Sequence, residues 1–271
     1  MALLDLFIAA VVPCLVLLWL IIRRDRYERE PFRLLLVTFI LGAFSIVPAV
    51  VVELGLSSIV VEPEEPLSDL VGLILHNLIA IAVVEESFKL LATLPAYRSR
   101  AFNEPIDGVV YATTAALGFA TVENIFYVLE GGWLVALLRA SLSVPGHAFF
   151  GATMGFYLGM QKTRRKDRLM VHALLVPTVL HTVYNVVVSV GLGLLSLLLA
   201  ASFILLLYRR VNRQIALTQR ISPFKPRQEG FCIYCGSALS QGWLYCVACG
   251  RSQVPSEPED ELTRRESPNL V

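Results

Sequence analysis

The chain has 271 residues, of which 56% are hydrophobic and only 17% are charged, and its formal net charge is +1. Such a high apolar fraction is typical of a protein surrounded mostly by lipid, and it excludes an ordinary soluble domain. The near-zero net charge gives no indication of a partner, so the positions of the charges are more informative than their sum. We expect an all-α polytopic membrane protein.

Seven apolar segments are long enough to cross a bilayer, which needs roughly 20 residues of helix. In chain order they are 3–22, 34–54, 70–94, 106–129, 133–160, 169–190 and 192–208. The fifth is too long for one untilted helix, and Ser143-Val144-Pro145-Gly146 interrupts it. Because proline removes a backbone donor, we expect a break there and a helix that restarts near His147. The sequence therefore predicts about seven transmembrane helices, one of them broken.

The basic residues predict the orientation. Of the 23 Lys and Arg residues, 21 lie in alternate loops or in the tail, and only Lys89 and Arg139 lie within the apolar segments. Loops rich in Lys and Arg stay in the cytosol. We expect a multi-pass protein of the cytoplasmic membrane with its amino terminus outside and its carboxyl terminus in the cytosol.

The third apolar segment carries charges near its middle: Glu85, Glu86 and Lys89. A charged side chain at the centre of a bilayer costs about 2.5 to 3.5 kcal/mol, so such groups usually face the bundle interior and serve a function. The helical period places Lys89 on the same side as the two glutamates. A purely structural ion pair could explain one glutamate and the lysine. The second carboxylate leaves a net negative charge that such a pair does not need.

Three later segments carry polar groups at similar depths. These groups are Glu123, Asn124, His147, His181 and Asn185. Each has a simpler explanation alone, since Glu123 could reach water, His147 could cap the restarted helix and His181 could bond a carbonyl. Arg139 could either reach the interface or pair with Glu123. The coincidence of depth on several helices favours one shared site.

The order of these motifs resembles a known family. The motifs are Glu85-Glu86-x-x-Lys89, Phe119-x-x-x-Glu123 with Asn124, His147, and His181-x-x-x-Asn185. Over about residues 30–190 the chain resembles the PrsW family of intramembrane proteases, which is similar to the CAAX prenyl proteases and bacteriocin-processing enzymes. One departure from the prenyl-protease pattern is Glu123, where those enzymes have histidine. The resemblance implies an intramembrane endopeptidase with a glutamate-activated water and no small-molecule cofactor. It also implies a membrane-protein substrate in the lipid bilayer, such as a single-span anti-sigma factor.

The residues themselves are consistent with peptide hydrolysis, which needs a base, a donor for the oxyanion and an acid for the leaving amine. Glu85 or Glu86 can act as the base, His147 and His181 can orient water or pass a proton, and Asn185 can donate to the oxyanion. A zinc protease is the alternative, with His147, His181 and a glutamate as ligands and an open position for water.

Two functions other than catalysis are also consistent with intramembrane charges. An ion-coupled transporter keeps carboxylates and lysine at the midplane, but it usually has internal repeats, and we find none. A non-catalytic membrane scaffold would retain the histidines for packing but would not need the Glu-Glu pair, which this chain keeps.

The tail contains two Cys-x-x-Cys-Gly motifs, and their cysteines are Cys232, Cys235, Cys246 and Cys249. This spacing is typical of a zinc ribbon, in which a structural metal supplies the folding energy of a module too small to build a core. We expect the ribbon to bind a cytosolic protein. The predicted domains are a membrane protease domain (1–210), a linker (211–230), the ribbon (231–251) and a disordered tail (252–271).

Overall fold

The computed structural model describes residues 3–164, 168–225, 230–232, 234–239 and 245–252. Two compact units divide the chain, Met1–Phe224 and Lys225–Val271. The first unit is a helical bundle and the second is a small cysteine-containing module, and each is described by itself below.

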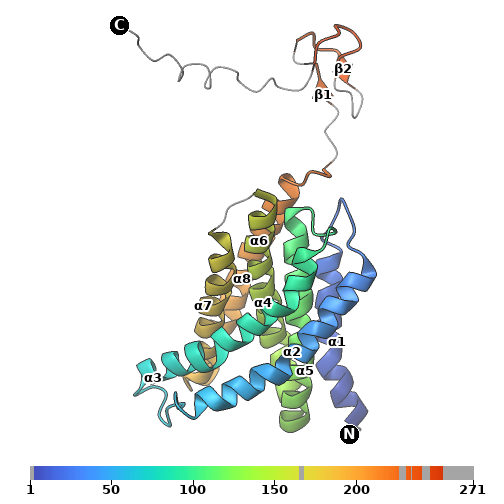
Figure 1. Ribbon diagram of the computed structural model, residues 1–271. Helices are drawn as coiled ribbons and strands as arrows, with labels where there is room; N and C mark the ends of the chain where they lie inside the picture. The colour runs from blue at the N-terminus through green and yellow to red at the C-terminus, as the bar shows by residue number, and fades with distance from the viewer. Residues whose placement is uncertain (1–2, 165–167, 226–229, 233, 240–244, 253–271) are drawn as a thin grey trace, which may run out of the picture. The chain divides into compact units, whose positions relative to one another are not determined.

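The first unit consists of helices (Figure 1). In chain order they are α1 (Leu3–Ile22), α2 (Phe32–Ser57), α3 (Leu70–Leu75), the π-helical η1 (His76–Ala82), α4 (Val83–Arg98), α5 (Pro105–Leu138), the π-helical η2 (Arg139–Ser143), α6 (Val144–Arg164), α7 (Leu169–Ser189) and α8 (Leu194–Arg220). In the described part of the chain, six continuous helical runs are long and apolar enough to cross a membrane. This confirms the expected all-α polytopic membrane fold.

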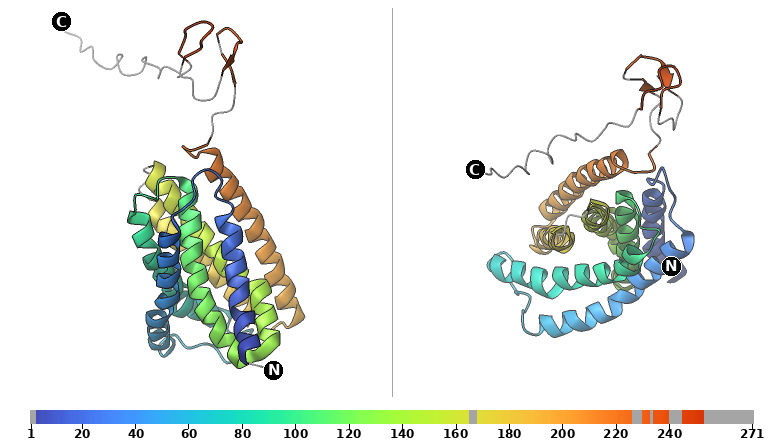
Figure 2. Two further views of the ribbon diagram at one scale, coloured as in Figure 1. Left: turned by 90° about the vertical axis from the view of Figure 1, so that its right-hand side faces the viewer. Right: turned by 45° about the horizontal axis from the view of Figure 1, so that its top comes forward.

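One of these six runs crosses twice. The run Pro105–Thr163 has 59 residues, which would extend about 90 Å if it were straight, several times what a bilayer core needs. It reverses at Gly132, whose φ of 70° and ψ of −156° are not helical. The returning α6 packs against the first part of α5, where Gly155 approaches the backbone of Gly108. α5 and α6 lie side by side (Figure 2). With two crossings from this run and one from each of the other five, the first unit has seven, in agreement with the prediction.

The predicted break at Pro145 is wrong, because the helix continues there from η2 into α6. The reversal at Gly132 lies in the predicted loop between the fourth and fifth segments. Pro145 is the second residue of α6 and directly follows η2. In a π-helical turn the backbone bonds span five residues, as when Val144 N–H donates to the Arg139 carbonyl. Pro145 directly follows this change of spacing, and the helical run continues through it. Glycine reaches the positive φ of the reversal without strain.

The last helix is longer than the apolar segment that predicts it. We expected it to end near Tyr208, but α8 continues to Arg220, so the predicted linker begins with ten residues of helix. This extension buries one stripe, formed by Val211, Gln214, Ile215 and Thr218. Their spacing of three and four residues is that of an amphipathic helix. The buried side chains anchor the extension to the bundle.

α5 lies at the centre of the bundle. Every residue from Pro105 to Thr121 is buried, because α1, α2, α4 and α6 pack around this helix. Large apolar side chains on the outer helices remain exposed, for example Phe44, Val51 and Leu134, as lipid-facing surfaces require. A polar side chain on any face of this part of α5 is therefore buried inside the bundle.

In the second unit, β1 (Gly230–Phe231) pairs antiparallel with β2 (Ala238–Leu239), with Gly230 opposite Leu239 and Phe231 opposite Ala238. Tyr245 forms an isolated bridge with Ser252. Apart from Ser252, the predicted disordered tail lies outside the described residues.

Candidate functional site

Glu85, Glu86 and Lys89 form a buried ion cluster near the start of α4. Lys89 Nζ lies 2.8 Å from Glu85 Oε2 and 2.9 Å from Glu86 Oε1. Glu86 and Lys89 are fully buried, and Glu85 is 5% exposed. The helical period therefore brings the lysine between both carboxylates, as the sequence predicted.

His147 joins this cluster to Glu123. Its Nδ1 lies 3.0 Å from Lys89 Nζ, and its Nε2 lies 2.9 Å from Glu123 Oε2. An ammonium group can only donate, so Nδ1 accepts from Lys89, and the proton of the neutral imidazole sits on Nε2, beside Glu123. The contact with Lys89 thus selects the tautomer of neutral His147.

His181 approaches the same carboxylates from α7. Its Nδ1 lies 3.0 Å from Glu86 Oε1. The rings of His147 and His181 meet edge to face, with 5.4 Å between their centroids. Two histidines and three glutamates from α4, α5, α6 and α7 thus share one site.

Arg139 pairs with Glu123 rather than reaching the interface, since its guanidinium lies 2.9 Å from Glu123 Oε2. Asn124 supports this pair from behind. Its Oδ1 accepts from Arg139 Nε at 2.7 Å, and its amide donates to the Ala10 carbonyl at 2.6 Å. Asn124 therefore positions Arg139 and ties α1 to α5, without touching the histidines or the Glu-Glu pair.

Asn185 lies one turn after His181 on α7 and is half-buried. Within the described residues, no hydrogen bond joins its amide to the cluster. His76 lies in η1 outside the cluster, where its Nδ1 contacts the Val60 carbonyl at 2.7 Å.

A cavity of about 520 Å³ lies beside the ion cluster, between α2, the end of η1, α4 and α5. Its lining residues are Ile46, Val47, Val50, Val51, Glu53, Ile81, Glu85, Phe119, Glu123, Phe126 and Tyr127. Glu85 lines it, whereas Glu86 lies behind Glu85 and does not. The two adjacent glutamates are therefore not equivalent, because only one faces a space that could hold substrate and water.

Glu53 is a residue of the site that the sequence motifs do not predict. This residue ends the second apolar segment, where a charge is ordinarily assigned to the membrane interface. In the structure it lines the cavity with Glu85 and Glu123, and its Oε1 is buried without a hydrogen-bond partner among the described residues. The signal was a lone carboxylate after Val50-Val51-Val52, inside the span rather than beyond it.

The cluster also has the donors of a metal site. One oxygen each of Glu85 and Glu86 and a nitrogen of His181 lie within 4.8 Å of one another. Oε2 of Glu86 is buried and has no hydrogen-bond partner in the described part of the chain. Two carboxylates and one imidazole fit a catalytic zinc with an open position. His147, which the sequence suggested as a ligand, is not in this group, because its two nitrogens contact Lys89 and Glu123.

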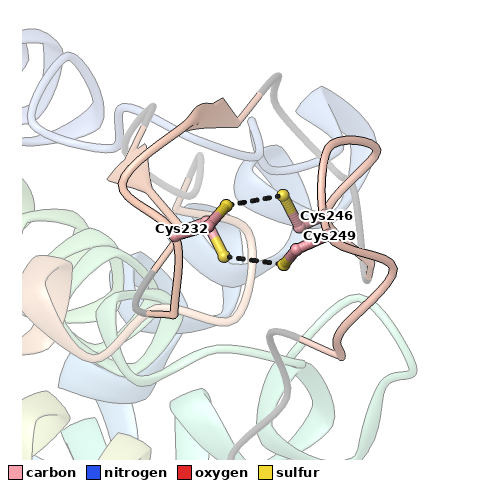
Figure 3. Close-up of side chains that lie close together, drawn as sticks. Cys232, Cys246 and Cys249 are labelled. Carbon is pink, nitrogen blue, oxygen red and sulfur yellow. Dashed lines mark hydrogen bonds between the residues drawn. The ribbon is translucent and has the colours of Figure 1, made fainter.

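A second metal-ligand group lies in the tail, where the four predicted cysteines come together (Figure 3). Cys232 Sγ lies 3.6 Å from Cys249 Sγ, and Cys235 Sγ lies 3.6 Å from Cys246 Sγ. A tetrahedral zinc with bonds of about 2.3 Å separates its sulfurs by about 3.8 Å, so the four thiols fit this metal.

Both halves of the ribbon use the same turn. Gly236 N–H donates to the Cys232 carbonyl at 2.8 Å, and Gly250 N–H donates to the Cys246 carbonyl at 2.7 Å. The two glycines have φ values of 74° and 72°, which residues with a side chain rarely adopt. The repeated Cys-x-x-Cys-Gly motif thus encodes two matching turns, each of which carries two of the four cysteines.

Comparisons with known proteins identify the family of the chain. Residues 30–208 match the model of the family described as PrsW family intramembrane metalloprotease. Protease PrsW of Oceanobacillus iheyensis is 35% identical over 206 residues, which cover 75% of this chain and 91% of that protein. Protease PrsW of Clostridioides difficile is 34% identical, covering 69% and 80%, and that of Bacillus subtilis is 31% identical, covering 67% and 81%. No solved structure matches the chain.

Proposed function

The chain belongs to the PrsW family of intramembrane proteases, and we propose that it cleaves membrane-protein substrates with a water molecule activated by Glu85. The observation that carries this assignment is that Glu85, and not Glu86, lines the cavity. A base must come within hydrogen-bond reach of the water whose proton it takes. Glu85 meets this requirement because a water bound in the cavity can contact its carboxylate directly.

The neighbouring groups have supporting roles in this scheme. Lys89 holds Glu85 in place and offsets its charge. Glu86 also pairs with Lys89, and His181 contacts Glu86 in turn. Water adds to the scissile carbonyl as its proton passes to Glu85, and the same proton then passes to the leaving amine as the C–N bond breaks. We assign Asn185 as the oxyanion donor, because its amide is not engaged by another described group.

A zinc-dependent version of the reaction is the second candidate, favoured by the description of the matching family and by the grouping of Glu85, Glu86 and His181. These three residues would hold the metal, and a bound zinc would polarise the carbonyl and acidify water. In this version Lys89 and His147 keep their contacts at the edge of the site and orient the glutamates.

Chelation of zinc distinguishes the glutamate scheme from the metal scheme, provided that the ribbon can no longer bind zinc itself. We would compare the protein with a variant in which all four ribbon cysteines are serine, and treat both with a zinc chelator. The glutamate scheme predicts that peptide cleavage by the serine variant survives chelation. Loss of cleavage that returns when zinc is added would establish the metal scheme instead.

The substrates in this proposal are membrane proteins, with single-span proteins such as anti-sigma factors as the first class to examine. Membrane proteomes of cells carrying the intact chain should contain shortened forms of such proteins that are missing when the cells carry Glu85→Gln. A transporter or a non-catalytic scaffold predicts identical proteomes in the two strains.

We also propose that the amino terminus lies outside the cell and the carboxyl terminus in the cytosol, on the evidence of the basic loops. Cysteines introduced at Glu64 and Arg168, both exposed, test this in a background without native cysteine. An impermeant thiol reagent added to intact cells should label Glu64→Cys and not Arg168→Cys. The reverse pattern would invert the orientation.

For the tail, we propose one structural zinc held by the four cysteines and a cytosolic protein as the partner of the ribbon. The sulfur spacing and the paired glycine turns support the metal. The position of the ribbon after a long basic helix supports a regulatory role on the cytosolic side.

A further inference from the structure

Glu53 differs from the other carboxylates of the cavity. Glu85 has Lys89 as its counter-ion, and Glu123 has Arg139 and His147. Glu53 lines the same cavity without an ion pair among the described residues, and its Oε1 is buried without a donor. A buried carboxylate oxygen that lacks a donor loses its hydration without compensation, which is unfavourable. A ligand with a hydrogen-bond donor would supply the bond that this oxygen lacks.

The cavity is open toward the lipid. Val51 on α2 and Phe126 on α5 both line it, yet they are 67% and 64% exposed on the outer surface of the bundle. Tyr127, also a lining residue, is 52% exposed. A segment of another membrane protein can therefore reach Glu53 and Glu85 sideways between α2 and α5, without first leaving the bilayer.

A substrate in this cavity has a particular chemical need. A transmembrane helix must unwind locally before a base and water can reach its peptide bond, and the unwound N–H groups then lose their partners. In an apolar setting each such group costs several kcal/mol. The cavity wall is apolar except for the three carboxylates and the hydroxyl of Tyr127. Glu53 is the carboxylate among these that forms no ion pair with a cation in the described part of the chain.

We propose that Glu53 is a substrate-positioning residue, which accepts a hydrogen bond from a backbone N–H of the unwound substrate segment in the cavity between α2 and α5. The occupant is thus a stretch of an apolar membrane segment in extended form. This inference rests on the proposed function, since it places the substrate beside Glu85. Glu53 itself takes no part in the chemical step.

The two substitutions that test this role differ in one property. Glu53→Gln keeps an acceptor oxygen at the same distance from the backbone. Glu53→Leu replaces the carboxylate by an apolar side chain and so removes the acceptor. Glu62→Leu serves as the matched control, since it removes an exposed carboxylate from the loop after α2. The probe is a fluorescent synthetic peptide of about 20 apolar residues, long enough to span a bilayer, with a central Gly-Gly pair and no ionisable side chain in the span.

Peptide binding is measured in lipid nanodiscs. We expect Glu53→Leu to weaken binding about tenfold, which corresponds to the 1.4 kcal/mol of one hydrogen bond. Glu53→Gln should bind within about threefold of the unaltered protein, and Glu62→Leu should bind like it. In cleavage, Glu53→Leu should raise KM and leave kcat nearly unchanged.

Several outcomes would overturn the assignment: no binding of the peptide by the unaltered protein, equal binding by Glu53→Leu, or a loss in Glu53→Gln as large as that in Glu53→Leu. A fall in kcat with unchanged KM would move Glu53 into the chemical step. Glu85→Gln in the same assay separates this inference from the proposed function. If Glu85→Gln binds the peptide and still cleaves it, the base is wrongly assigned while the role of Glu53 is unaffected.

Discussion

Lys89 Nζ and His147 Nδ1, 58 residues apart in the chain, lie 3.0 Å from each other inside the bundle. The contact joins α4 to α6 and, with the ion pairs to Glu85 and Glu86, uses all three N–H donors of the ammonium. Lys89 is thus the cation around which the glutamates and the first histidine are arranged.

Removing this cation should destabilise the bundle strongly. Lys89→Met leaves two buried carboxylates without a counter-ion, and breaking a buried pair in this way costs about 3 to 5 kcal/mol. The thermal midpoint of the purified protein in detergent should fall well below that of the unaltered protein. Adding Glu86→Gln to Lys89→Met should restore part of the loss, since one buried charge is then removed. A double variant less stable than Lys89→Met would contradict this account of the cluster.

The close contact of α5 and α6 gives a second prediction. A Cβ at Gly155 would lie 1.9 Å from the Gly108 carbonyl oxygen, and the atom it meets is backbone that cannot turn aside. Gly155→Ala should therefore lower the thermal midpoint and reduce the amount of assembled protein. Gly55→Ala is the matched control, because no atom lies within 4 Å of that position, and it should be neutral or slightly stabilising. Equal midpoints for the two variants would show that the helices separate easily.

Asp25, in the loop between α1 and α2, predicts a pH dependence of stability. Burial, together with the charges of Glu104 and Asp107, raises the pKa of Asp25 from 3.8 to about 7. A raised carboxyl pKa means that the folded state favours the protonated form, so its contribution is complete below about pH 4 and is lost as the pH rises to 7.

Asp25→Asn cannot ionise and should escape this loss. Its thermal midpoint should exceed that of the unaltered protein clearly at pH 8 and only slightly at pH 5. The exposed Glu62→Gln, measured in parallel, should differ from the unaltered protein equally at both pH values. A difference for Asp25→Asn that is larger at pH 5 would reverse the sign and refute the assignment.

The ribbon predicts stoichiometric metal binding. A peptide of residues 228–252 should bind one zinc under reducing conditions and become ordered, because it has too little apolar surface to fold without the metal. Cys235→Ser should bind far more weakly. Circular dichroism and a zinc titration with a chelating dye follow the two effects, and an ordered peptide without zinc would contradict the metal-dependent fold.

Much of the site was predictable because helical geometry is local. The spacing of Glu85, Glu86 and Lys89 decides that they share a face, and the depth of His147 and His181 follows from their distance to the segment ends. The pairing of Glu123 with Arg139 was one of two alternatives, and it depends on how two helices pack, which spacing within one segment does not determine.

The errors have physical causes of a different kind. Proline is a strong helix breaker by propensity, yet the helix continues through Pro145 directly after the π-helical turn of η2. The reversal at Gly132 lies in the predicted loop, and it uses the positive φ that glycine adopts easily. Glu53 was missed because hydropathy treats a charge at a segment end as an interface residue. Its contact with the cavity arises from the packing of α2 against α5, which no local pattern encodes.

The most direct test of the central claim is the cleavage rate of the same membrane peptide by Glu85→Gln and Glu86→Gln, with thermal midpoints and peptide binding measured alongside. Gln keeps the shape of the side chain and removes its basicity. We predict that Glu85→Gln binds the peptide normally and cleaves it about 10²- to 10⁴-fold more slowly, as expected for loss of a positioned base. Glu86→Gln should lose stability and a smaller part of the rate. Normal cleavage by a folded Glu85→Gln, or a larger loss in a folded Glu86→Gln, would contradict the account.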